Sequence, residues 1–76
     1  MGQHWPLMFS KIVRYQQQTR HYSIAATDTG WEVKEVRDSE VVRRVRYHDW
    51  HRVERARRSI AIELDDLQRQ GWSEAN

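Results

Sequence analysis

Basic side chains are the chemical groups that stand out most in this sequence. Nine of its 13 lysines and arginines fall between Lys34 and Arg58, although the formal net charge is only +2. Local patches of charge should therefore matter more than the net charge. Clustered basic side chains are typical of surfaces that contact the phosphates of nucleic acids. Whether these residues share a surface depends on the elements that carry them.

The patterns that indicate catalysis or metal binding are missing from the sequence. It contains no cysteine, which excludes disulfides and thiolate metal sites and fits a reducing cytoplasm. His48 and His51 are close in sequence, but they lack the cysteines or convergent carboxylates of a zinc site. No nucleophile–base spacing or phosphate-binding glycine loop is present. We expect no enzymatic activity, no cofactor and no small-molecule substrate.

Three strands are predicted in the middle of the chain, at 20–26, 31–37 and 41–47. Each alternates apolar and polar residues, and the segments 27–30 and 38–40 between them supply turn residues. Connections this short join antiparallel neighbours, so the prediction is a three-stranded meander.

A four-residue first loop and a three-residue second loop determine the register of this meander. They pair Ile24 with Val33, and Val33 with Val45. The core face then carries Tyr22, Ile24, Ala26, Trp31, Val33, Val41, Val45 and Tyr47.

The other face of the predicted sheet aligns Ser23, Lys34 and Arg44 across the strands and places Arg46 beside Glu32. Lys34 opposite Arg44 is a like-charge pair, which costs about 0.2 to 1 kcal/mol and would be relieved by a bound anion. This favours a phosphate-contacting sheet. The alternative is a solvated face on which acidic residues dilute the charge.

A long helix is predicted to follow, beginning at Trp50. Asp49 is suited to the N-cap, while Gly71 suits the left-handed position after the helix, with Trp72 packing back on Leu67. The helix turns its apolar stripe to the sheet. The stripe consists of Trp50, Val53, Ala56, Ile60, Ala61, Leu64 and Leu67.

The outward side of this helix carries further basic residues. Arg55 and Arg58 are candidates for secondary contacts with a nucleic acid. The alternative is a solvated, salt-bridged face, since Glu54 can pair with Arg58 at i,i+4. Ile62 lies in the middle of this outward row and has no role in the predicted core.

The predicted helix is longer than the strands that it covers. About 21 helical residues span roughly 31 Å, whereas seven-residue strands reach only about 23 Å. The far end therefore needs an apolar partner, either the stretch 7–13 folding back or a second protomer. As an interaction surface we predict Ile62, Leu64, Leu67 and Trp72.

The predicted fold class is α+β: a three-stranded antiparallel meander packed against one long C-terminal helix. It divides the chain into an N-terminal arm at 1–19, a single domain at 20–72 and a frayed tail at 73–76. No apolar run reaches the roughly 18 residues that a membrane helix needs, so no membrane partner is expected.

This architecture resembles the small DNA-binding domains of tyrosine-recombinase arms and of plant ethylene-response factors, in which such a sheet lies in the major groove. The resemblance is one of architecture alone and transfers no residue. Our first hypothesis is a small cytoplasmic accessory or regulatory protein that binds DNA or RNA, with Lys34, Arg44 and Arg46 as phosphate contacts. The alternative is a protein-interaction module or homodimer that uses the C-terminal half of the helix.

Overall fold

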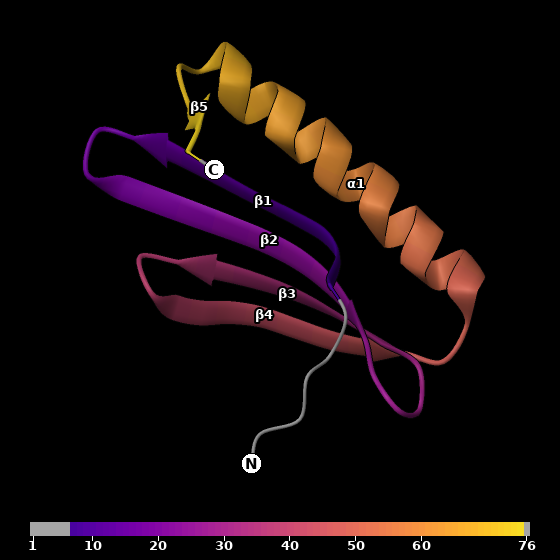
Figure 1. The fold of residues 1–76 in the computed structure, drawn as a ribbon. Helices are drawn as coiled ribbons and strands as arrows, with labels where there is room; N and C mark the ends of the chain where they lie inside the picture. Colours follow the sequence, from indigo (N-terminus) through magenta and orange to yellow (C-terminus); the bar gives the residue numbers. More distant parts are fainter. Residues whose placement is uncertain (1–6, 76) are drawn as a thin grey trace.

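A computed structural model describes residues 7–75 as one antiparallel sheet with one helix (Figure 1). The sheet has five strands in the order β4-β3-β2-β1-β5, so the predicted α+β class is confirmed. Residues 1–6 of the predicted arm and Asn76 of the predicted tail lie outside the described residues. The elements are β1 (Leu7–Tyr15), β2 (Gln18–Ala26), β3 (Trp31–Arg37), β4 (Glu40–Tyr47), α1 (Trp50–Arg69) and β5 (Ser73–Glu74).

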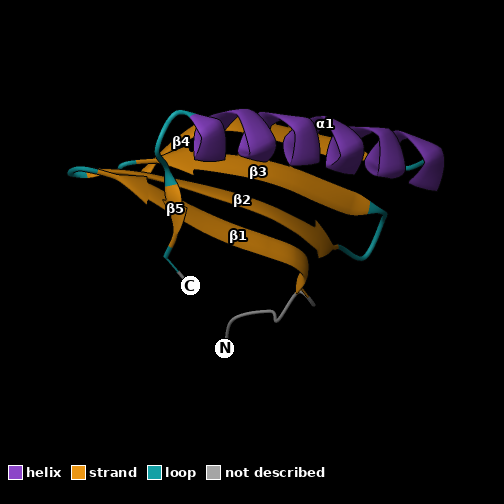
Figure 2. Ribbon diagram, turned by 90° about the horizontal axis from the view of Figure 1, so that it is seen from above, coloured by secondary structure: helices purple, strands orange, loops and turns teal. Residues whose placement is uncertain are grey.

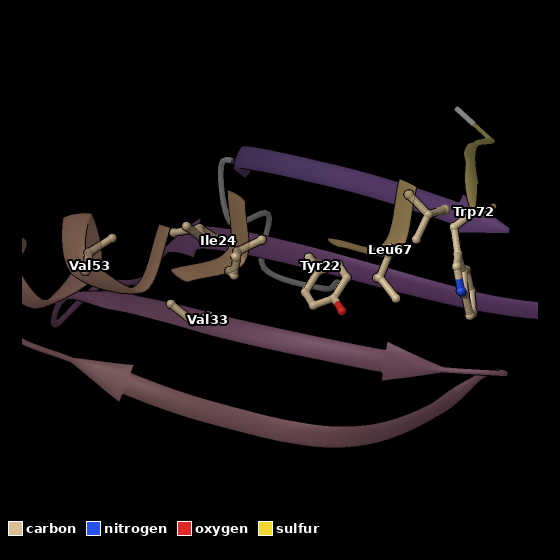
Figure 3. Close-up of a cluster of buried hydrophobic side chains, with 8 residues drawn as sticks. Tyr22, Ile24, Val33, Val53, Leu67 and Trp72 are labelled. Carbon is tan, nitrogen blue, oxygen red and sulfur yellow. The ribbon is translucent and has the colours of Figure 1, made fainter. Parts of the chain in front are cut away.

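The helix lies over one face of the sheet, and no other described element covers the opposite face (Figure 2). The core is the layer of apolar side chains between α1 and the sheet (Figure 3). Strands β1, β2 and β3 all contribute fully buried residues to this layer, whereas β4 contributes only half-buried ones. The buried set is Val13, Tyr22, Ile24, Val33, Val53, Ile60, Leu67 and Trp72.

The predicted three-stranded meander is present as β2, β3 and β4, but the sheet is larger than predicted because the chain before Arg20 also forms strands. Residues of β1 pair with β2 from Leu7 opposite Ala25 to Tyr15 opposite Gln18. Gln16 has a φ of 58° and lies in the tight turn that joins the two strands. Apolar residues occur on both faces of β1, which weakens the alternation that identifies a strand.

The predicted overrun of the helix is also corrected. Strands β1 and β2 have nine residues each, about 30 Å, which equals the length of a twenty-residue helix. Val13 of β1 lies in the core, and the ring of Tyr15 stacks on Trp72 with 5.7 Å between centroids. The apolar gap at the end of the helix is therefore filled by the same chain.

The predicted frayed tail takes part in the sheet. Ser73 and Glu74 form β5, which pairs with β1 opposite Arg14 and Val13. The backbone N–H of Ala75 donates to the carbonyl of Ile12 at 2.8 Å. The last described residues thus form a short edge strand beside β1.

Both predicted ends of the helix are confirmed. The Asp49 carboxylate accepts a hydrogen bond from the N–H of His51 at 2.9 Å, as an N-cap does. At the other end the N–H of Trp72 donates to the carbonyl of Leu67 at 3.0 Å, and Gly71 has a φ of 108°. This is the Schellman arrangement, and it turns the chain towards β5.

The apolar stripe of the helix is narrower than predicted. Val53, Ile60 and Leu67, at intervals of seven residues, are buried. Ala61 is exposed instead of facing the sheet, and Trp50 is 38% exposed although its ring lies 5.3 Å from that of Trp31. A seven-residue repeat selects one side of the helix, so Ala61 falls on its flank.

The register of β3 with β4 is as predicted at Val33 opposite Val45 but shifts near the turn. Asp38 and Ser39 both have positive φ and make a two-residue turn, not the predicted three-residue loop. An irregularity follows, so that Val36 pairs with Val41. Val41 is 45% exposed and does not belong to the core face, which corrects its predicted position.

The buried Tyr22 hydroxyl should make the stability of the fold depend on alkaline pH. Burial, together with the nearby Glu63 carboxylate, raises the pKa of Tyr22 from 10.0 to about 12. The unfolded chain loses this proton near pH 10 while the folded chain keeps it. The free energy of unfolding should therefore fall as the pH rises from 10 to 12, by about 2 to 3 kcal/mol in total.

Urea denaturation at a series of pH values would measure this effect. Tyr22→Phe should remove this part of the alkaline loss, whereas Tyr15→Phe, at a partly exposed tyrosine, should keep it. An unchanged alkaline slope in Tyr22→Phe would contradict the assignment.

Candidate binding edge and groove

Strand β4 is the outer strand on one side of the sheet and, among the described residues, pairs with β3 alone. Beyond the irregularity near its start, the segment 43–47 pairs with β3 without interruption. Arg43, Val45 and Tyr47 point to the side of the helix, and Arg44 and Arg46 point to the open face. The outer edge of β4 therefore presents backbone hydrogen-bonding groups between two rows of side chains.

A groove of about 360 Å³ lies between β4 and the helix. Here α1 covers the helix side of β4 only in part, since Val45 and Tyr47 are half-buried and Arg43 is exposed. Its apolar lining includes Val33, Val45 and Ile60, while Arg52 and Arg55 enter from the helix. Its remaining lining residues are Arg43, Tyr47, Ala56 and Ser59.

Five arginines surround this part of the molecule, and we call them the basic edge: Arg43, Arg44, Arg46, Arg52 and Arg55.

Two glutamates of β3 offset part of the charge of the basic edge. Glu35 is buried and accepts ion pairs from Arg37 at 2.6 Å and Arg43 at 3.4 Å. Glu32 lies 3.7 Å from Arg44 and 3.4 Å from Arg46. Five arginines against these two carboxylates leave the edge positively charged, so it should attract an anionic partner.

The predicted nucleic-acid residues do not form one surface. Ser23, Lys34 and Arg44 lie in one row across the open face, as the predicted register requires. Ser23 is only 6% exposed and offers little contact. Arg55 and Arg58 are on α1, which covers the opposite face of the sheet (Figure 2). Arg46 pairs with Glu32, as predicted.

The predicted interaction surface on the helix is mostly internal. Leu67 and Trp72 are 4% and 7% exposed and belong to the core, and Leu64 is partly buried against it. Ile62 alone of the four is open to solvent, at 66%. The apolar contacts that were expected from a second protomer at this end of the helix are supplied by Val13 and Tyr15 of β1.

Sequence reasoning missed the groove, although one signal for it was available. The predicted register already placed Arg43 on the same face as Val45, and an arginine there indicates that this part of the face is not fully buried. The position of the helix over β1 could not be foreseen without β1 itself.

Comparison of the chain with protein-family models, curated proteins and solved structures finds no match. Within residues 7–75, no group of three or more histidine, aspartate or glutamate side chains is placed to hold a metal ion. Within the same range, α1 is too polar to cross a membrane.

The two glutamates of β3 should differ in how strongly stability depends on their arginine partners. Replacing both Arg37 and Arg43 by alanine would leave the buried Glu35 without a cation, which should cost about 2 to 4 kcal/mol. Replacing Arg44 and Arg46 removes partners from the more exposed Glu32 and should cost at most about 1 kcal/mol. Thermal and urea unfolding of the two double variants would measure the difference. Equal losses would contradict the role given to Glu35.

Proposed function

We propose that this protein is a small, non-enzymatic binding module that takes a partner protein at β4 and in the groove beside it. The observation that carries the proposal is the combination of a strand edge that is unpaired among the described residues with a groove of apolar and basic residues along the same strand. An open edge binds the backbone of a partner, and pockets beside it select side chains. Arginine is also among the residues enriched in protein interfaces.

The distribution of charge favours a protein over a nucleic acid as the partner. Arg44 and Arg46 share the carboxylate of Glu32, which lowers the positive potential of the open face. Arg58 is on the helix and outside the groove, so it does not add to the positive charge of the open face. The apolar residues of the groove have no use in contacts with phosphates, which are polar and charged.

Site-specific photo-crosslinking in cells of the source organism would test this proposal. A photoreactive amino acid at Ser59, which lines the groove, should give one reproducible protein adduct. The same amino acid at Ala61, an exposed residue outside the groove on the same helix, should not. The adduct should also weaken at least about threefold in an Arg55→Glu background, because the groove loses a cation.

Equal adducts at Ser59 and Ala61, or an adduct that persists unchanged with Arg55→Glu, would contradict a partner in the groove. Arg58→Glu is the matched charge control, since it makes the same change on the same helix outside the groove.

Nucleic-acid binding on the open face is the second candidate, and one observation favours it. Lys34 lies opposite Arg44 in the sheet and has no carboxylate within 4.0 Å among the described residues. A phosphate between them would relieve their repulsion. In this alternative Lys34, Arg44 and Arg46 contact the backbone of DNA or RNA, and Arg55 and Arg58 add more distant attraction.

An NMR titration at low salt with short duplex DNA and with single-stranded RNA would test this candidate. Shifts should cover the open face, and binding should weaken steeply with salt. Lys34→Ala with Arg44→Ala should reduce the slope of log K against log salt by about two. Unchanged binding in this double variant would remove the open face as a nucleic-acid surface.

A further inference from the structure

The form of the β4 edge restricts what kind of partner can occupy it. Residues 43–47 form the regular part of an outer strand, with the groove on its helix side. A strand added beside β4 would alternate its side chains between the two faces of the sheet. Every second side chain would enter the groove, and the others would lie beside Arg44 and Arg46 on the open face.

The groove side of such a strand would meet a mixed surface, in which apolar side chains lie between Arg43, Arg52 and Arg55. Its neighbours there would be Val45 and Tyr47 of β4, with Ile60 of the helix above them. Apolar side chains in these positions would cover surface that α1 leaves open. The open-face side would meet two arginines, where acidic side chains make favourable cross-strand pairs.

A second copy of this chain fits the edge poorly. Pairing β4 with another β4 about a twofold axis would bring the segment 43–46 of one copy against that of the other. Each copy would contribute Arg43, Arg44 and Arg46, and like charges across strands are destabilising. Charged side chains on an edge strand are a common means of preventing such self-association. The same charges favour an acidic segment.

We propose that β4 binds an extended acidic segment of another protein as an added strand, with alternate apolar side chains of that segment in the groove. This inference rests on the proposed function and specifies the partner's chemistry. The main chain of the segment hydrogen-bonds to the outer edge of β4. Its acidic side chains pair with Arg44 and Arg46 on the open face, while Arg52 and Arg55 at the mouth of the groove attract the acidic segment at longer range.

Synthetic peptides test this without knowledge of the natural partner. The probe is a capped peptide of about eight residues in which glutamate alternates with valine and leucine, a length that matches an ordinary strand. NMR titration of the full chain should shift the amides of 43–47 and of Arg52, Arg55 and Ser59. A peptide with lysine in place of glutamate should bind at least about tenfold more weakly.

Two further peptides distinguish strand addition from non-specific binding to the charged surface. In one, the same residues are reordered so that the apolar ones no longer alternate. In the other, backbone N-methyl groups are placed at alternate residues, in either of the two registers, to block main-chain hydrogen bonds. The reordered peptide and one of the two N-methylated registers should lose binding at least about tenfold, because each lacks one requirement of an added strand.

Matched variants of the protein complete the test. Ser59→Trp should fill the groove and abolish peptide binding, whereas Ala61→Trp should leave it unchanged. Arg55→Glu should weaken binding more than Arg58→Glu. Circular dichroism and thermal unfolding identify any variant that fails to fold. The double variant Arg44→Glu with Arg46→Glu changes two exposed positions and should also weaken peptide binding.

The outcomes separate this inference from the proposed function. Full binding of both N-methylated peptides, or equal binding of the lysine peptide, overturns acidic strand addition. Absence of shifts at millimolar peptide also overturns it, as does a β4–β4 dimer found by sedimentation of the full chain. The groove adduct from Ser59 tests the proposed function independently of any peptide. An adduct without peptide binding therefore rejects this inference alone.

Discussion

The packing of one narrow stripe of α1 against strands β1, β2 and β3 is the contact on which the rest of this structure depends. Val53, Ile60 and Leu67 are buried along its length, and each such side chain contributes roughly 1.5 to 3 kcal/mol. A chain of 76 residues can build only one small core, so this layer must be complete. The Schellman turn after the helix extends the layer, because it directs Trp72 onto Tyr15.

The place of β4 in the sheet decides where unpaired backbone is found. It is the outer strand of the described sheet, and a groove lies between it and α1. The arginines at this edge are compatible with the fold, since they can extend into water and two carboxylates of β3 hold some of them in place. They also protect an exposed edge from pairing with itself. An edge that excludes its own copy and attracts acidic groups, as we propose for β4, would be selective for its partner.

Local patterns predicted the central part of the fold well. Short loops and period-two alternation identified β2, β3 and β4 and the pairing of Val33 with Val45. The caps at Asp49 and Gly71 located the helix. The β1 strand was missed because Ile12 and Val13 place apolar side chains on both of its faces, which hides the alternation. A two-residue strand such as β5 has too few residues to produce any pattern.

The sequence by itself determined the α+β class, the register at the centre of the sheet, the ends of the helix and the row from Ser23 to Arg44. These features depend on neighbours in the chain or on the fixed geometry of short turns. Only the tertiary structure decided which strands α1 covers, that Leu67 and Trp72 are internal, and that β4 is an open edge beside a groove. Those features depend on how the strands of the sheet pack against a single helix. That packing is determined by contacts between residues distant in sequence, which local patterns do not reveal.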